Sequence, residues 1–351
     1  MERYYYNHMN KIQQKVYLAM KAGLTAIDSA FLVTRLEIRE LGEIFFKLRL
    51  DCPDIFYAVN LQFRSYQGSG NVEVVPEYLF DKGKIKEHQK AMNARITKLI
   101  RPAMSMTDLE KELFIHDFVC SNVRYDKLKK PYSHEIIGPL GQGVGVCEGI
   151  AKTVKILCDA LGIWCIIPIS DANPDKKIKY RHAWNIVKID GKYYQLDVTF
   201  DNSLGHDGII RYDYFNLEDK QFFRDHGPVI YEVPACKEGN HFYYREKKLS
   251  FTKTEDVTKR TIQAIRKGKP LIFHWRGGYL TRETLSELLL LLEQTARQKG
   301  RHARTSLNWP QAVFQIAFTE ETPVEEVIVE AANEGELYHL SSLNDQLSQQ
   351  H

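Results

Sequence analysis

The sequence lacks the marks of a membrane-spanning, secreted or nucleic-acid-binding protein. No apolar run approaches the ~20 residues that cross a bilayer, and residues 1–24 have polar residues throughout, without the apolar core of a signal peptide. Lys and Arg number 48 against 45 for Asp and Glu, and this net charge of +3 is too balanced for a chain whose main partner is nucleic acid. We therefore expect a cytoplasmic protein with no membrane span and no nucleic-acid partner.

Cysteine is also sparse, with six residues in 351 and no CxxC pair. A disulfide framework is typical of short secreted chains with a higher cysteine density, and a structural zinc site usually contains a CxxC pair. We therefore expect reduced and mostly buried thiols, and no structural zinc.

Length and patterning predict three parts. At ~150 residues per domain, 351 residues make two or three domains, and 44% hydrophobic with 26% charged residues fit a folded chain. Residues 1–104 mix helical and strand patterns. Residues 105–238 have helices followed by antiparallel strands, which is typical of an α+β domain, and residues 239–351 have the pattern of a small α/β domain.

Hydrophobic periodicity and turn residues place the main elements. We expect helices over 5–22, from Thr34 to Cys52, over 107–122 and over 147–162. A further helix is expected to contain Ile85 and to end near Pro102. We expect strands over 55–59, 61–66, 72–75 and 163–169, and a hairpin of 180–189 with 192–200. Further on, His274 lies in a predicted strand beside an aromatic residue, where a histidine is more often structural than part of a site.

One cysteine has a distinctive setting. Glycines at 141, 143 and 145 lead into Cys147, and apolar residues then recur at helical spacing up to Gly162. Because glycines permit tight turns, this segment delivers the thiol to the first turn of an amphipathic helix. The N–H groups and the dipole at a helix start favour negative charge, which favours a reactive thiolate.

The predicted hairpin brings a histidine and a carboxylate together. Asp190-Gly191 is a strong type I′ turn signal, so residues equidistant from it face each other, His182 with Thr199 and Asp197 with Trp184. His182 and Asp197 are then diagonal neighbours on one face of the sheet, ~7–8 Å apart at Cα and within reach of a hydrogen bond. Contact with Cys147 further requires that its helix pack on this face.

Each of these residues alone has a structural alternative. A strand histidine is more often a core or surface residue without chemistry, and an aspartate near a strand end is more often a cap or turn residue. Trp184 fits a wall of a site, and it also fits plain core. The combination of Cys147, His182 and Asp197 is what favours a thiol active site.

Three motifs in this order resemble the transglutaminase-like superfamily of papain-like Cys-His-Asp proteins, in its bacterial form. They are GVCEGIA at 145–151, HAWN at 182–185 and GKYYQLDVT at 191–199. Flanking pieces such as IHDF at 115–118 extend the resemblance to about residues 107–230. Phe200 departs from the family pattern, in which many members have Trp, and we expect little effect on chemistry because it lies on the sheet face opposite Asp197.

The resemblance implies a fold and a mechanism. The fold is a papain-like core in which the nucleophile helix packs on an antiparallel sheet. Cys147 is expected to be the nucleophile, His182 the general base and acid, and Asp197 the orienting carboxylate. The substrate is a protein or peptide whose amide forms an acyl-enzyme, and the mechanism needs no metal and no cofactor.

The resemblance also directs attention to the residues around the nucleophile. The backbone N–H of Cys147 is a natural donor to the oxyanion. Gln142 and Tyr125 are candidates for the second donor, and Trp184 is a candidate wall of the site.

Four functions fit these residues. We favour a cysteine peptidase or amidase, and acyl transfer from a protein glutamine to an amine uses the same triad. A catalytically silent binding module on the same fold is the third. A metal site built from Cys147, His182 and Asp197 is the fourth, and it explains the same residues with more assumptions.

Overall fold

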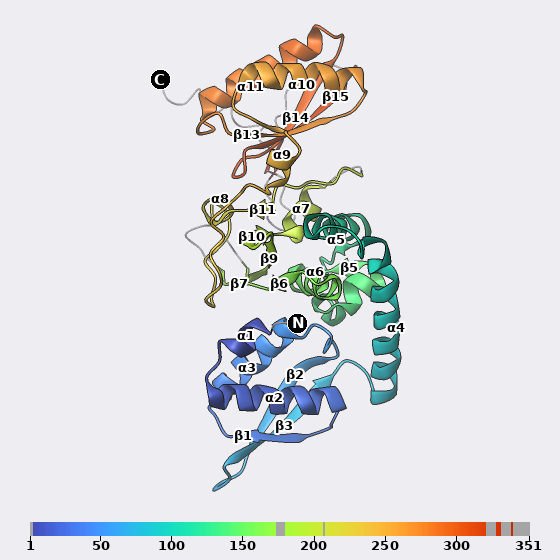
Figure 1. Cartoon of the computed structure of the whole chain (residues 1–351), viewed down its shortest axis with the longest axis vertical. Coiled ribbons are helices and arrows are strands. Elements are labelled where there is room, and N and C mark those ends of the chain that lie inside the picture. The colour runs from blue at the N-terminus through green and yellow to red at the C-terminus, as the bar shows by residue number, and fades with distance from the viewer. Residues whose placement is uncertain (1–2, 173–179, 206–207, 321–327, 331–337, 340–351) are drawn as a thin grey trace. The chain divides into compact units, whose positions relative to one another are not determined.

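The computed structural model describes residues 3–172, 180–205, 208–320, 328–330 and 338–339 (Figure 1). Contacts divide the chain into two compact units: unit 1 is Met1–Asn202 with Gly227–Cys236, and unit 2 is Ser203–His226 with Lys237–His351. Helices are combined with largely antiparallel sheets, which confirms the α+β class. The three-part division of the chain stays a prediction. In the described parts of the chain, no helix is long and apolar enough to cross a membrane.

The first part of unit 1 combines helices with a three-stranded antiparallel sheet of order β1-β3-β2. Its elements are α1 (Tyr4–Asn7), α2 (Lys11–Ala26), β1 (Phe31–Thr34), α3 (Ile38–Asp51), β2 (Ala58–Ser65) and β3 (Asn71–Tyr78). The single helix predicted over 5–22 is wrong, because the Asn10 side chain accepts from the N–H groups of Ile12 and Gln13 and starts a new helix. The strands predicted over 55–59 and 61–66 are instead one strand, β2, which contains a bulge.

Two longer helices follow, α4 (Lys82–Ile100) and α5 (Asp108–Asn122). The predicted capping box of α5 is confirmed. The Thr107 hydroxyl accepts from the N–H of Glu110, and the Glu110 carboxylate accepts from the N–H of Thr107.

The second part of unit 1 holds the predicted nucleophile helix and the hairpin. Helix α6 (Cys147–Leu161) ends at Gly162, whose φ is 79°. Strand β9 (Asn185–Ile189) lies between β10 (Lys192–Leu196) and β6 (Trp164–Ile166) and is antiparallel to both. Because α6 contacts β6, β9 and β8 (His182–Ala183), the helix packs on the sheet as predicted.

The buried strand predicted over 163–169 is two strands, β6 and β7 (Ile169–Ser170). Pro168 lies between them, and proline has no N–H to donate to a ladder. After this break the chain pairs with β8, where Ser170 lies opposite His182.

The hairpin has the predicted turn and the predicted register. Asp190 and Gly191 have φ of 48° and 77°, as a type I′ turn requires, and the ladder ends at the pair Leu196↔Asn185. The strand predicted to continue to residue 200 is wrong, because helix α7 (Val198–Leu204) begins there. His182 therefore faces Ser170 in the ladder, and the predicted pair with Thr199 is wrong.

Unit 2 is built on a sheet of order β12-β13-β15-β14-β16-β17. Its strands are β12 (Ser250–Phe251), β13 (Leu271–Trp275), β14 (His302–Asn308), β15 (Val313–Thr319), β16 (Ile328–Glu330) and β17 (Tyr338–His339). Helices α10 (Thr254–Arg266) and α11 (Arg282–Arg297) contact each other and cover one face of this sheet (Figure 1). The same unit contains β11 (Phe215–Leu217), α8 (Asp219–Phe222) and α9 (Tyr243–Glu246).

A buried polar cluster holds the segment 203–226 within unit 2. Arg211 donates to the Asp213 carboxylate through Nε at 3.0 Å and through Nη2 at 2.7 Å. The Tyr244 hydroxyl and the Asn308 amide donate to the same carboxylate at 2.9 Å. This cluster links residues that are about one hundred positions apart in sequence, which explains why a segment preceding 227–236 joins the unit that follows it.

Candidate active site

Cys147 is the first residue of α6 and is half-buried. Val146 before it is extended, and the first bond of the helix runs from the N–H of Ile150 to the carbonyl of Val146 at 2.9 Å. The N–H groups that precede Ile150 have no acceptor within the helix. They give the start of the helix, where Cys147 lies, a partial positive charge.

Glycines allow the loop before α6 to approach a neighbouring turn closely. The N–H of Val146 donates to the Ser133 carbonyl at 3.0 Å. A Cβ on Gly149 would lie 2.1 Å from the same carbonyl oxygen, and a Cβ on Gly145 would lie 2.7 Å from the Pro139 ring. The glycines of GVCEGIA therefore hold Cys147 against the turn that contains Ser133.

Replacing Gly149 with Ala is expected to destabilise unit 1 by at least ~1–3 kcal/mol, because the new methyl group overlaps a backbone oxygen that cannot rotate away. Urea denaturation measures this loss. Gly42→Ala is the matched control, since Gly42 lies in α3 with nothing within 4 Å of the added Cβ, and alanine there is expected to stabilise the helix by ~0.5–1 kcal/mol. Equal stability of the two variants would contradict the close approach.

His182 and Asp197 form a hydrogen bond inside the unit. Nε2 of His182 lies 2.5 Å from Oδ2 of Asp197, whose side chain is fully buried, whereas 13% of the His182 side chain is exposed. Oδ1 of Asp197 accepts from the N–H of Phe200 at 3.0 Å. Asp197 thus caps α7 with one oxygen and binds His182 with the other, so the cap and the orienting carboxylate are the same group.

Aromatic rings enclose the imidazole of His182. Trp184 is stacked on it with centroids 5.9 Å apart, and Phe200 contacts it with centroids 4.9 Å apart. The indole of Trp184 is fixed in turn by a 2.7 Å hydrogen bond to Gln195. The expectation that Phe200 lies opposite Asp197 is wrong, because the chain turns into α7 after Asp197 and brings Phe200 round to His182.

The surroundings of His182 favour its charged form. Burial lowers the pKa of His182, but the Asp197 charge and hydrogen bond, with a hydrogen bond to the Cys147 side chain, outweigh burial and raise the pKa to about 10. His182 is therefore protonated at neutral pH and lies between Asp197 and Cys147. The structure brings together the three residues that the motifs single out.

The two residues suggested as oxyanion donors lie near the loop before Cys147. Tyr125 belongs to β4 (Arg124–Tyr125), which pairs with β5 (Val144–Gly145) so that Tyr125 lies opposite Gly145. Gln142 is exposed at the end of a single helical turn, Gly138–Gln142. A role for either as a donor stays a prediction.

Sequence reasoning missed a buried group of charges next to Cys147. Lys152 of α6 has no exposed side-chain surface and pairs with Glu135 at 2.8 Å and Glu148 at 2.7 Å. Arg49 of α3 also pairs with both carboxylates. Burial raises the pKa of Glu148, but the charges of Lys152 and Arg49 and a hydrogen bond from His134 outweigh it and hold this pKa well below its usual range. The spacing of Glu148 and Lys152, one helical turn apart, was the available signal.

A second missed cluster fixes α7. His116 of α5 is fully buried, with Nε2 3.1 Å from Asp201 of α7 and Nδ1 3.1 Å from Asp117. Asn202 of α7 donates to the carbonyl of Cys120 at 3.2 Å. These bonds anchor the helix that Asp197 caps. The IHDF piece at 115–118 contains His116 and Asp117. The sequence therefore showed the motif but did not indicate that it anchors α7.

Comparisons with known proteins agree with the site. Residues 93–198 match the family model of the transglutaminase-like superfamily, and no curated protein matches the chain. Solved structures that it resembles include a TGase (14% identity, 40% of this chain and 44% of that chain, TM-score 0.26). Another is a candidate cysteine protease from Cytophaga hutchinsonii, with 15% identity over 40% of this chain and 61% of that chain and a TM-score of 0.26. A third is a candidate protease from Parabacteroides distasonis, with 14% identity over 39% of this chain and 36% of that chain and a TM-score of 0.21.

This chain spans less than two thirds of each of those structures, at 44%, 61% and 36% of their chains. The family match covers the start of α6, β8 and the end of the hairpin, which are the elements that carry Cys147, His182 and Asp197. Residues 93–198 of the chain are therefore identified as a region similar to the transglutaminase-like superfamily.

Proposed function

We propose that this protein is a thiol enzyme that cleaves an amide or peptide bond through Cys147, His182 and Asp197. The observation that supports it best is the 2.5 Å hydrogen bond between His182 and the buried carboxylate of Asp197, with the Cys147 side chain as a further partner that raises the pKa of His182. A protonated histidine beside a thiol at a helix start stabilises the thiolate, which is the nucleophilic form.

The proposed reaction begins when the Cys147 thiolate attacks the carbonyl carbon and a C–S bond forms. The negative charge moves to the carbonyl oxygen, where the N–H of Cys147 can donate. His182 gives its proton to the amide nitrogen, the C–N bond breaks, and the amine leaves. Water then attacks the acyl-enzyme and gives a proton to His182, and the acid and the thiolate are released. Asp197 keeps the ring oriented throughout and stabilises its charged form before acylation and after deacylation.

Two alternatives use the same side chains. If a lysine amine replaces water, the enzyme is an acyl transferase and joins two proteins. If substrate does not reach the triad, the domain is a binding module. A metal site would need the same atoms of His182 and Asp197, which here form a 2.5 Å hydrogen bond with each other, and loss of a stoichiometric ion on chelation would indicate it.

Alkylation by iodoacetamide, mapped by residue across pH 4–9, tests the proposed ion pair. We expect Cys147 to react well below the pH of ~8.5 at which a free thiol ionises. In His182→Ala this early reaction is expected to disappear, because the cation that stabilises the thiolate is absent. The buried thiols Cys158 and Cys236 serve as internal controls and are expected to stay unreactive in both proteins.

The same wild-type protein distinguishes the outcomes. Hydrolysis releases peptide fragments from a fluorescent casein, whereas acyl transfer incorporates a fluorescent amine into it. If Cys147 reacts only as an ordinary thiol and His182→Ala changes nothing, the triad is not assembled and the proposal is wrong.

A further inference from the structure

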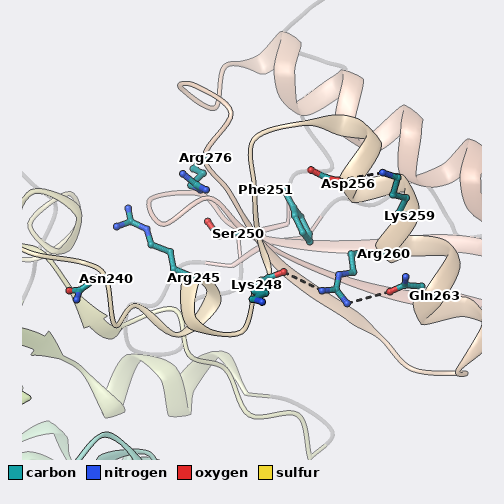
Figure 2. A pocket seen from close by; sticks show the side chains of 10 residues that line it. All are labelled: Asn240, Arg245, Lys248, Ser250, Phe251, Asp256, Lys259, Arg260, Gln263 and Arg276. Atoms are coloured by element: carbon teal, nitrogen blue, oxygen red, sulfur yellow. Dashed lines mark hydrogen bonds and ion pairs between the residues drawn. The ribbon is translucent and has the colours of Figure 1, made fainter. Parts of the chain in front are cut away.

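Unit 2 contains a pocket of about 920 Å³ that no part of the proposed reaction uses (Figure 2). It lies between α9, β12, α10 and the residue that follows β13. Its volume is within the range of ~300–1,000 Å³ that is usual for small-molecule sites. It is lined by Asn240, Arg245, Lys248, Ser250, Phe251, Asp256, Lys259, Arg260, Gln263 and Arg276.

The lining is strongly cationic. It contains three arginines, two lysines and one carboxylate, a balance of 5 − 1 = +4. The carboxylate, Asp256, lies 3.9 Å from Lys259 in a largely exposed pair, and such a pair is weak. The remaining cations are therefore available to a ligand.

Neutral acceptors hold two of the three guanidinium groups. Arg245 donates to the Gly239 carbonyl at 2.9 Å, and Arg260 donates to the Gln263 side-chain oxygen at 3.3 Å and the Lys248 carbonyl at 3.5 Å (Figure 2). In the parts of the chain that the structure describes, neither these two nor Arg276 forms an ion pair with a carboxylate. Neutral acceptors thus hold Arg245 and Arg260 and leave their charge in the pocket.

The positive charge of the lining also affects a buried histidine beneath the pocket. Ser250 in the lining contacts Nδ1 of the buried His274 at 2.8 Å. Burial, together with the charges of Arg245, Arg224 and Arg276, lowers the pKa of His274 to about 3. His274 therefore stays neutral beneath the lining, and the positive charge of the pocket comes from its lysines and arginines.

A second hollow of about 660 Å³ adjoins this pocket, because both are lined by Asp256 and Lys259. Trp275 lines it, and among the described residues its buried Nε1 has no hydrogen-bond partner. Helix α10 begins beside it without a side-chain cap. The N–H groups of an uncapped helix start are donors for acceptor oxygens.

The charge in the pocket is local to it. The whole chain has a net charge of +3, so the net charge of the pocket lining, +4, is larger than that of the whole chain. The basic stretch near residue 300 is partly neutralised, since Arg297 pairs with Glu293 and Arg301 with Glu320. Nucleic acid would need an extended basic surface, whereas a confined charge of +4 suits a compact anion.

We propose that this pocket binds a small ligand that carries two or more neighbouring phosphate groups. Each phosphate has three acceptor oxygens and a charge of about −1.5 to −2, so two of them match the charge of the lining. The guanidinium fork donates two parallel hydrogen bonds to such oxygens. A single carboxylate would leave most of the charge unpaired.

Calorimetric titration of the full chain with inorganic tripolyphosphate in 150 mM KCl, without divalent metal, tests the proposal. We expect saturable binding at one site per chain. Arg260→Gln and Arg276→Gln are each expected to weaken it by about tenfold, the size of one lost charged hydrogen bond. The matched control is Arg266→Gln, which removes the same charge from an exposed position on α10 outside the pocket.

A second readout locates the ligand. Saturating tripolyphosphate is expected to shift the NMR signals of the His274 ring, and citrate at the same concentration is expected to shift them much less. Equal affinity for ATP indicates that phosphates alone are recognised, and tighter ATP binding indicates that a nucleotide is the source; both support the proposal. Binding that is lost at 150 mM KCl, that Arg266→Gln weakens equally, or that only poly-glutamate or RNA shows would overturn it.

Discussion

Cys147→Ala is expected to abolish amide hydrolysis and amine incorporation while the chain stays folded. The sulfur is the atom that forms the acyl-enzyme, and no other group at the site can replace it. In enzymes with such triads, removing the nucleophile lowers kcat by about 10⁶-fold. The side chain is half-buried, and its loss leaves the bond between His182 and Asp197 unchanged. Release of fragments from fluorescent casein and incorporation of a fluorescent amine measure the two reactions.

Cys236→Ala is the matched control for this variant. Cys236 is a buried thiol in the apolar core of the same unit, so its truncation is expected to cost stability and leave turnover at the wild-type level. Comparison of the two variants separates loss of a thiol in general from loss of the nucleophile. Residual turnover of Cys147→Ala above a few per cent of wild type would show that another group carries out the chemistry.

The position of Cys147 could be predicted because its signals are local. Glycines before it and helical periodicity after it lie within twenty residues of sequence, and α6 begins and ends where these patterns place it. The hairpin register was equally accessible, since a two-residue turn with positive φ at both positions fixes which residues pair.

The contact between His182 and Asp197 was predicted by an argument that is only partly right. The ladder ends at Leu196, and His182 pairs with Ser170 of another strand. The two side chains meet because Asp197 caps α7 with one oxygen and keeps the other for His182. A pattern of period two could not reveal this, since the strand stops where a side chain competes for the backbone. The same event places Phe200 against His182.

The buried charges around α6 could not be predicted from one-dimensional patterns. Glu135, Glu148 and Lys152 are polar residues that a hydropathy pattern assigns to the surface. Their burial depends on Arg49, about a hundred residues earlier in the chain, on a helix of the N-terminal part. Such a network exists only once the fold has brought α3 to α6.

Lys152→Met is expected to destabilise the protein by about 3–5 kcal/mol. The ammonium group is fully buried and pairs with two carboxylates, of which Glu135 has 1% of its side chain exposed. Removal of one partner from a buried ion pair leaves charge without compensation, and this costs far more than the pair itself contributes. Urea denaturation at pH 7 gives the change in the free energy of unfolding. Lys84→Met is the control, since Lys84 belongs to an exposed pair with Glu87, and its loss is expected to leave the free energy of unfolding close to that of the wild type.

The double variant Lys152→Met, Glu135→Gln distinguishes lost charge balance from lost packing, because Arg49 and Glu148 then remain as a balanced pair. If an uncompensated carboxylate causes the destabilisation, neutralising Glu135 restores much of the stability. If the double variant is as unstable as Lys152→Met, the methylene packing of the lysine is responsible instead.

The pH dependence gives an independent check of the same network. In the wild type the lowered pKa of Glu148 adds stability at pH values above the ~4.3 of a free glutamate, and this contribution is lost as the pH falls through the lower pKa of the folded chain. Lys152→Met removes the largest opposing charge, so the pKa of Glu148 is expected to rise and its contribution to disappear at higher pH. The variant should therefore lose relatively less stability on acidification below pH 4 than the wild type. Glu148 follows Cys147 directly, so this network also fixes the turn of helix on which the proposed nucleophile lies.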